Sequence, residues 1–292
     1  MYKSKILLAI IFFLNCSDEE KIRFTYYDNG KIKEKYVYQS KNDIKSFQAY
    51  LYSENGQLLK NATYKDGMLD GESIVYFDSG KISSIINYKA GMRNGKTVIF
   101  NELGEVQKSM SYKNDSLHGI SRIFGKKNDL IKEFLYINGS QKVYREFYKN
   151  HDGSITKFVC YDLKDDSIAT SCGELVSNTV TKIPIENLSF YYFINAPSDT
   201  IGINETFKAN VKFFNEGLWN LELYLGELDE NLNFTGNPQL IKSSNKTIDF
   251  KVKPKHNGIN LLLGKIVVSN DIESNDENYE FIFYHEYYVK KQ

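Results

Sequence analysis

Apolar and polar residues alternate along residues 58–136, and the pattern recurs every 24 residues. Alternate residues of a β-strand share one face, so each copy is expected to contain a strand. One face of that strand carries an apolar residue, a polar residue, an apolar residue and a tyrosine, and the other carries mainly Lys, Gln, Ser, Asn and Thr. The four sets are Leu58, Lys60, Ala62, Tyr64; Ile82, Ser84, Ile86, Tyr88; Val106, Lys108, Met110, Tyr112; and Leu130, Lys132, Phe134, Tyr136.

A shorter apolar run follows in three copies: SIVYF, TVIF and SRIF. We expect this run to form a second, shorter strand, so that each copy is a hairpin. A single hairpin is only marginally stable in water, and neighbouring copies have to support one another. This part of the chain is therefore expected to be all-β, an antiparallel meander of stacked β-hairpin repeats.

The turns carry glycine at repeating positions, as in YKDGMLDGE and YKAGMRNGK. Glycine adopts positive φ without strain, and Asn and Asp tolerate it best among the other residues, which explains Asp115 in YKNDSLHGI. The repeat-turn glycines are Gly56, Gly67, Gly71, Gly80, Gly91, Gly95, Gly104, Gly119 and Gly139. The residues that vary between them are expected to form exposed tips and, if the turns recognise anything, to be where recognition occurs: Met68, Leu69, Asp70, Met92, Arg93, Asn94, Ser116, Leu117 and His118.

The phrases DNGKI, ENGQL and DSGKI, followed by Y-K-x-G-x-x-x-G, resemble the MORN-repeat variant, which also occurs in YwqK-family antitoxins. The resemblance covers roughly residues 24–150 and implies the repeat architecture. The antitoxin label implies a cytoplasmic inhibitor, and the N-terminal signal described next argues against that location. An exported immunity protein fits both resemblances.

The N-terminus has the composition of an export signal. Lys3 and Lys5 precede an apolar run at residues 6–14, which is too short to span a membrane and suits a signal peptide. The run ends at Cys16, followed by SDEE, which resembles a Bacteroidetes-type lipoprotein signal although Asn15 replaces the usual small residue. Lipidation of Cys16 is expected to anchor the chain to the membrane, at the outer membrane or cell surface. The alternative is a secretory signal with an incidental cysteine.

Two further cysteines, Cys160 and Cys172, flank a turn signal at residues 164–166. A hairpin about Asp166 places them opposite each other, where a disulfide forms outside the cytoplasm. The alternative is two buried free thiols.

The 24-residue period ends before about Ile183, and six strand-like runs follow: LSFYYFI, ETFKANVKFF, WNLELYLGEL, KTIDFKV, INLLLGKIVV and YEFIFYHEYYV. Their turn-separated layout predicts a β-sandwich that loosely resembles immunoglobulin-like modules. The expected domains are a signal peptide (1–15), an acidic tether (16–22), MORN-variant repeats (23–155), a hairpin or linker (156–182) and the sandwich (183–292).

Composition and motifs indicate no catalytic, metal-binding or nucleic-acid-binding site. Lys plus Arg equals Asp plus Glu, 37 each, so no net charge favours nucleic acid. The four histidines are scattered, no catalytic or metal motif occurs, and no cofactor or metal is expected. His118 sits at a turn position held by Asp70 and Asn94, which favours a solvated turn residue. The acidic residues of 271–277 lack the order of an EF-hand and are expected to be a solvated loop.

We therefore expect a non-enzymatic cell-envelope lipoprotein that uses its repeat sheet as a binding or scaffold surface. The alternative is an antitoxin or immunity protein that neutralises a toxin. The expected partners are the membrane, through the anchor, and an unidentified protein or glycan. The tyrosine row at positions 64, 88, 112 and 136 either recognises that partner or covers the sheet's own apolar face.

Overall fold

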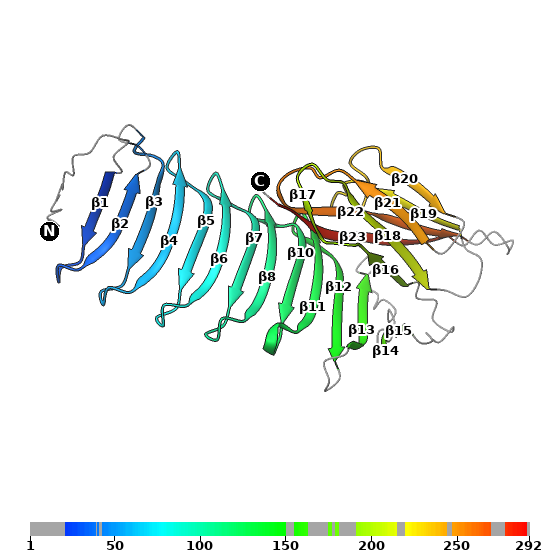
Figure 1. Cartoon of the computed structure of the whole chain (residues 1–292), viewed down its shortest axis with the longest axis horizontal. Helices are drawn as coiled ribbons and strands as arrows, with labels where there is room; N and C mark the ends of the chain where they lie inside the picture. Colours follow the sequence, from blue (N-terminus) through cyan, green and yellow to red (C-terminus); the bar gives the residue numbers. More distant parts are fainter. Residues whose placement is uncertain are drawn as a thin grey trace. The chain divides into compact units, whose positions relative to one another are not determined.

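In a computed structural model of the chain, the residues that the structure describes are all-β apart from one short 3₁₀ helix (Figure 1). The structure describes residues 21–38, 40, 43–149, 155–162, 175–176, 179–180, 191–214, 220–243, 247–269 and 278–290. Within these ranges no helix has the length and apolar character needed to cross a membrane. The expected all-β fold class is confirmed.

The chain divides into two compact units. The first is Met1–Leu117 with Ser121–Asp129, and the second is His118–Ile120 with Leu130–Gln292. This division rests on contacts, whereas the expected boundary at residue 155 rests on the repeat pattern. The expected domain boundaries stay predictions.

The first unit is a meander in which consecutive strands pair antiparallel (Figure 1). Its strands are β1 (Lys21–Tyr26), β2 (Ile32–Tyr38), β3 (Phe47–Tyr52), β4 (Leu58–Lys65), β5 (Met68–Tyr76), β6 (Ile82–Lys89), β7 (Met92–Phe100), β8 (Val106–Lys113), β9 (Ser116–Leu117) and most of β10 (Gly119–Phe124), followed by the 3₁₀ helix η1 (Lys126–Asn128). Both β9 and β10 pair with β8. The predicted meander of hairpins is thus confirmed.

Three-residue turns join strands at one edge of this sheet. In the turn after β5, Gly80 donates its N–H to the carbonyl of Phe77, and the N–H of Phe77 donates to the carbonyl of Lys81. Gly80 has a φ of 79°. A three-residue loop that ends in a positive-φ residue is a standard hairpin connection. The same hydrogen bonds recur around Gly30, Gly56 and Gly104, and Asn128, with a φ of 59°, occupies the position 24 residues after Gly104.

Two-residue turns join strands at the opposite edge. Between β4 and β5 they are Asp66 and Gly67, with φ values of 52° and 79°. Positive φ at both central residues is the mark of a type I′ turn, whose twist matches that of the flanking strands. The equivalent turns are Ala90–Gly91, Asn114–Asp115 and Asn138–Gly139, all with positive φ.

The tightness of these turns changes two expectations. In two of the three repeats the second strand is not the shorter one, because β5 begins at Met68 and β7 at Met92, and each has nine residues. In the third, β10 has six residues and is shorter than β8, which has eight. The stretches Met68–Asp70 and Met92–Asn94 consequently lie in strands rather than at the tip of a turn. Only the first residue of each stretch is exposed.

The second glycine of each turn phrase forms a β-bulge. In the β4–β5 ladder Ala62 pairs with Ser73 but Tyr64 pairs with Leu69, so several residues of β5 lie opposite Thr63. Gly71 lies in this bulge with a φ of 113°. A β-carbon there would lie 3.3 Å from the Cβ of Thr63. Gly95 repeats this geometry beside Asn87, so these glycines serve the bulge and not the turn.

The second unit holds the last repeat and two further packed sheets. Its strands are β11 (Leu130–Ile137), β12 (Ser140–Lys149), β13 (Ile155–Asp162), β14 (Leu175–Val176), β15 (Thr179–Val180), β16 (Tyr191–Asn195), β17 (Thr200–Gly202), β18 (Phe207–Phe214), β19 (Asn220–Leu225), β20 (Gln239–Ser243), β21 (Thr247–Val252), β22 (Gly258–Ser269) and β23 (Asn278–Lys290). All six C-terminal runs predicted from sequence contain a strand. The short strands β17 and β20 were not predicted.

The C-terminal strands form a β-sandwich. One sheet has the order β16-β18-β21 and the other β17-β23-β22-β19-β20. Both sheets contribute to a single buried cluster that includes Phe207, Phe250, Leu223, Ile266 and Phe283. Phe250 and Phe283 meet edge to face with ring centroids 5.7 Å apart. The expected sandwich is therefore present, and its resemblance to immunoglobulin-like modules stays a prediction.

A second buried cluster joins the last repeat to the sandwich within the second unit. Leu135 and Ile137 of β11 pack with Leu228, Leu263 and Tyr284, and both are fully buried. The hydroxyl of Tyr284 also donates to a carboxylate oxygen of Glu133 at 3.1 Å. The sandwich thus covers one face of the last repeat, opposite the side chains of Phe134 and Tyr136.

Candidate recognition face

One face of the first unit carries the repeated tyrosines, and we call it the tyrosine face. It is made by Tyr64, Tyr88 and Tyr112, the apolar residues Val75, Ile86, Ile99 and Met110, the basic residue Arg93 and the small residues between them. Tyrosines of successive repeats are two strands apart, which corresponds to about 9–10 Å. Each of these tyrosines is half-buried, as are the apolar residues beside them.

Small residues lie beneath the large ones along the centre of this face. Ala62, Ser73, Ile86, Thr97 and Met110 form one cross-strand row. Ser73 is fully buried and Thr97 is 5 % exposed. Within the part of the chain that the structure describes, neither hydroxyl has a hydrogen-bond partner. The buried small residues of this row, Ala62, Ser73 and Thr97, therefore form the floor of the face, with the tyrosines on one side of them and Val75 and Ile99 on the other.

The bulge glycines lie opposite tyrosines in the ladder. Tyr88 pairs across the ladder with Gly71 on one side and with Arg93 on the other. Tyr112 pairs in the same way with Gly95. A β-carbon at Gly71 or Gly95 would meet Thr63 or Asn87, which lie on the face opposite the tyrosines. The bulge position of one repeat therefore adds no side chain to the tyrosine face beside the tyrosine of the next.

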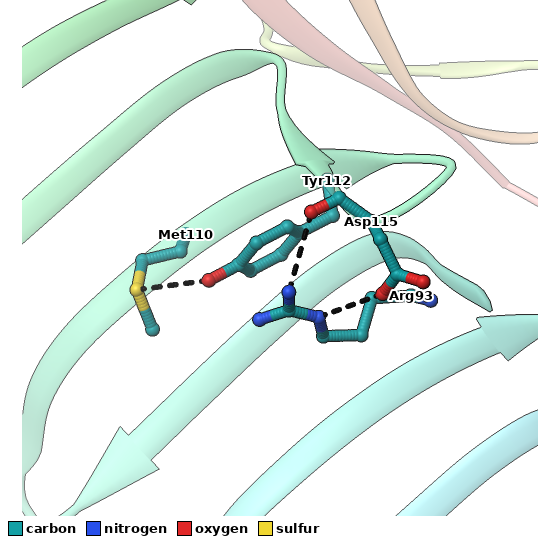
Figure 2. A network of polar contacts seen from close by, with 4 residues as sticks. All are labelled: Arg93, Met110, Tyr112 and Asp115. Carbon is teal, nitrogen blue, oxygen red and sulfur yellow. Dashed lines mark hydrogen bonds and ion pairs between the residues drawn. The ribbon is translucent and has the colours of Figure 1, made fainter. Parts of the chain in front are cut away.

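Arg93 is held on the tyrosine face beside the turn that contains Asp115 (Figure 2). Its guanidinium lies over the ring of Tyr112, with the Cζ atom 4.2 Å from the ring centroid. Its Nε donates to a carboxylate oxygen of Asp115 at 2.9 Å, and a terminal nitrogen donates to the carbonyl of Asp115 at 3.2 Å. The hydroxyl of Tyr112 points to the sulfur of Met110 at 3.7 Å.

This geometry has an electrostatic consequence. The hydrogen bond from Arg93 lowers the pKa of the Asp115 carboxyl below its ordinary value. The same bond raises the pKa of the Arg93 guanidinium. The Arg93 side chain remains 39 % exposed, so a partner can reach it. A cation fixed over an aromatic ring and still open to solvent is a preorganised contact for a second molecule.

The predicted recognition residues have a more specific structural role than expected. Asp70 accepts a hydrogen bond from the N–H of Ala90, and Asn94 donates to the side chain of Asn114. In the second unit, His118 accepts one from the N–H of Asn138 through its Nδ1 atom, at 3.3 Å. The third residue of each stretch therefore ties its strand to the next two-residue turn.

The other members of these stretches differ among themselves. Leu69, Arg93 and Leu117 lie on the tyrosine face, because they pair with Tyr64, Tyr88 and Tyr112. Met68 and Met92 are exposed beside the turns, and Ser116 takes the same position in the next repeat. Of the nine residues proposed from sequence, Arg93 is the one with a polar side chain on the tyrosine face.

An aromatic cluster extends the tyrosine face toward the first repeat. Phe47 stacks on Tyr64 with ring centroids 4.7 Å apart, and it also contacts Tyr36 and Tyr38. Burial, with a smaller contribution from the hydrogen bond to Glu34, raises the pKa of the Tyr36 hydroxyl to about 12. These rings replace the glycine–tyrosine pairing of the later repeats.

An apolar depression adjoins the face at the edge of the three-residue turns. It has a volume of about 640 Å³ and is lined by Phe77, Ile99, Phe100 and Leu103 among others. Leu103 is 77 % exposed. The tyrosine face therefore continues into an apolar surface at its edge.

Several predicted sites remain outside what the structure describes. Cys16 and Cys172 lie outside the described residues, and Cys160 is placed only as a backbone position in β13, opposite Arg145. Lipidation and the disulfide therefore stay predictions. Among the described residues, no group of three His, Cys, Asp or Glu side chains is arranged to hold a metal ion.

The patch that binds the last repeat to the sandwich was missed, although the sequence carried a signal for it. Positions 63, 87 and 111 are Thr, Asn and Ser, and the next copy has Leu135. Positions 65, 89 and 113 are Lys, and the next copy has Ile137. A polar face that becomes apolar in a single repeat marks the place where another element packs.

A comparison with known families agrees with the repeat geometry. The family model described as MORN repeat variant matches residues 19–40, 48–66 and 69–90. Each match corresponds to one hairpin built around a three-residue turn: β1–β2, β3–β4 and β5–β6. No curated protein matches the chain. The first unit therefore carries MORN-variant repeats at residues 19–90, and the same turn geometry recurs beyond them.

Proposed function

We propose that this chain is a non-enzymatic binding protein that recognises a protein partner through the tyrosine face, from a lipid anchor in the cell envelope. The observation that carries the proposal is the preorganised arrangement of Arg93 over Tyr112 on a half-buried apolar face. MORN-variant repeats at residues 19–90 support a repeat-based binding or scaffold role. The family match does not itself name a partner.

The composition of the face favours a protein partner. Tyrosine, methionine and arginine are the residue types enriched in protein interfaces, and tyrosine and arginine dominate their energetic centres. Tyr88, Arg93, Met110 and Tyr112 are neighbours here. Val75 and Ile99 add aliphatic surface farther along the same face, which suits side chains of a protein better than sugar hydroxyls. A glycan ligand is the competing outcome.

Apolar side chains of the first unit are also available for contact. Both large hydrophobic clusters among the described residues belong to the second unit. The aliphatic and aromatic side chains of the tyrosine face are half-buried within their own sheet instead. An apolar face that stays partly exposed is typical of an interaction surface.

The cellular location in this proposal rests on the sequence around Cys16. A lipid-anchored immunity protein would use the same face on a toxin, so the two alternatives differ in the identity of the partner and not in the recognition surface.

Two alanine variants in strand β7, one on each face of the sheet, test the proposal. Arg93 lies on the tyrosine face of β7 and Lys96 on the opposite face, where it pairs with Ser111. Proteins that co-purify with the wild-type chain from its own cells are quantified against Arg93→Ala and Lys96→Ala by mass spectrometry. We expect at least one protein that is depleted with Arg93→Ala and retained with Lys96→Ala. If the two variants retain the same proteins, the tyrosine face is not the recognition surface.

A further inference from the structure

Strand β1 forms an end of the repeat sheet in the first unit. In the part of the chain that the structure describes, no strand pairs with its outer edge. Apolar Ile22, Phe24 and Tyr26 alternate along it with Lys21, Arg23 and Thr25. Ile22 is 42 % exposed and Tyr26 is 40 % exposed. A strand edge with exposed apolar side chains is a template for pairing with another chain.

The direction of the backbone groups determines which residues can pair outward. The N–H of Tyr27 donates to the carbonyl of Lys31, so the backbone groups of Tyr27 face the β2 side. N–H and C=O of one residue point to the same side in an antiparallel ladder, and the side alternates along the strand. The backbone groups of Ile22, Phe24 and Tyr26 therefore face away from β2. The extra residue of the bulge in this hairpin lies in β2, which leaves β1 regular.

We propose that β1 pairs antiparallel with β1 of a second copy of this chain, about a two-fold axis at Phe24. Symmetric pairing of a strand with itself brings an outward-facing residue opposite another outward-facing residue. Centring on Phe24 pairs Phe24 with its own copy, Ile22 with Tyr26 of the second copy, and Arg23 with Thr25 of the second copy. Every exposed apolar residue of β1 then has an apolar partner.

The neighbouring symmetric register is less favourable. A two-fold axis at Arg23 places Arg23 opposite its own copy, and like charges directly opposite each other destabilise a strand pair. It also leaves Tyr26 beyond the end of the partner strand, since β1 begins at Lys21. A two-fold axis at Thr25 leaves Ile22 opposite Asp28, beyond the end of β1 at Tyr26. Charge and the match of apolar residues therefore select the register centred on Phe24.

The expected dimer is weak and reversible. The register allows about six main-chain hydrogen bonds, two for each outward-facing pair. Such an edge is small beside the roughly 1,600 Å² of a standard protein interface, so dissociation in the micromolar range is expected. Two copies held in one membrane would raise their local concentration.

Substitution of Phe24 by residues of opposite charge tests the pairing on the purified full chain. Light scattering and analytical ultracentrifugation measure the dimer dissociation constant of the wild type, Phe24→Lys, Phe24→Glu and an equimolar mixture of the two variants. Each variant alone is expected to raise the constant by roughly tenfold or more, because like charges then face each other at the axis. The mixture restores dimerisation. The control Met92→Lys, which changes an apolar residue 39 % exposed on β7, leaves the constant unchanged.

A monomeric wild type throughout the micromolar range overturns the proposal, and so does a dimer that survives both Phe24 substitutions. Hydrogen exchange on the wild-type chain needs no variant and covers the case in which a substitution unfolds β1. The amides of Ile22, Phe24 and Tyr26 are expected to exchange more slowly as concentration rises. Exchange at these amides that is independent of concentration contradicts the pairing.

Discussion

The bulge glycine is the position at which the repeat geometry restricts the residue type most strongly. Gly71 has a φ of 113°, and a β-carbon there would lie 3.3 Å from the Cβ of Thr63. Gly67, in the adjacent two-residue turn, has a φ of 79° and no atom within 4 Å of the same hypothetical carbon. Gly71→Ala and Gly67→Asn therefore separate the bulge from the turn.

The expected cost of Gly71→Ala follows from three contributions. Positive φ costs a residue with a β-carbon about 1–2 kcal/mol, and up to about 3 kcal/mol in a sparsely populated region. The close approach to the Cβ of Thr63 adds to this, because Thr63 has to shift to make room. Alanine lowers the entropy of the unfolded chain, which stabilises the folded state by about 0.4–1 kcal/mol. The net loss of unfolding free energy is about 1–3 kcal/mol.

Urea unfolding monitored by circular dichroism measures both variants against the wild type. Gly67→Asn is expected to cost less than about 1 kcal/mol, since Asn tolerates this φ and the repeat itself has Asp115 at the equivalent position. Equal stability of Gly71→Ala and the wild type would refute the bulge reasoning. A larger loss for Gly67→Asn than for Gly71→Ala would do the same.

Three further predictions follow from the same residues and from the N-terminus. Thr97→Val replaces a buried hydroxyl that has no hydrogen-bond partner by a methyl group of similar shape, and is expected to raise the unfolding free energy by about 1 kcal/mol; a loss of stability would show that the hydroxyl is satisfied in solution. Asp115 has a pKa below its ordinary value of 3.8 through the hydrogen bond from Arg93, so its contribution to stability is present above pH 3.8 and is lost as pH falls through the lower, folded-state pKa. Asp115→Asn should therefore flatten the acid side of the stability curve measured by thermal melting, and an unchanged acid limb would contradict the pairing. Cys16→Ala is expected to move the chain from the membrane to the soluble fraction of its own cells, and a variant that still sediments with membranes is not anchored through that cysteine.

Much of the first unit was predictable because its pattern is local and repeated. Period-two alternation located the long strands, and the period of 24 residues located the turns. The length of the second strand was predicted incorrectly because Gly71 and Gly67 look alike in a sequence. Only the ladder shows that Gly67 closes a two-residue turn while Gly71 opens a bulge several residues into β5.

The second unit shows which features local reasoning does not reach. Six strands of its sandwich coincide with apolar runs and were predicted, whereas β17 and β20 lie at the two edges of a sheet and were not. The hydrogen bond between Tyr284 and Glu133 joins residues 151 positions apart, and no pattern of spacing along the chain predicts it. The change to Leu135 and Ile137 was visible in the repeat alignment, and its physical meaning became clear only with the sandwich packed against it.

The contact between Arg93 and Tyr112 could likewise not be predicted from the sequence. The equivalent position of the three repeats holds Leu69, Arg93 and Leu117. Such variation indicates that the position tolerates different side chains, and it does not point to a specific role. The structure places it between two tyrosines, because Tyr88 pairs with it directly and Tyr112 lies beneath its guanidinium.

Photo-crosslinking in the cells that produce this protein tests most directly whether the tyrosine face binds a partner. A photoreactive phenylalanine is placed at Tyr88 on the tyrosine face and, as a control, at Asn87, the neighbouring residue on the opposite face of β6. The account predicts a crosslinked protein of defined mass at position 88 and none at position 87. Crosslinks at position 87 alone, or at neither position while the chain is folded and produced, would contradict it.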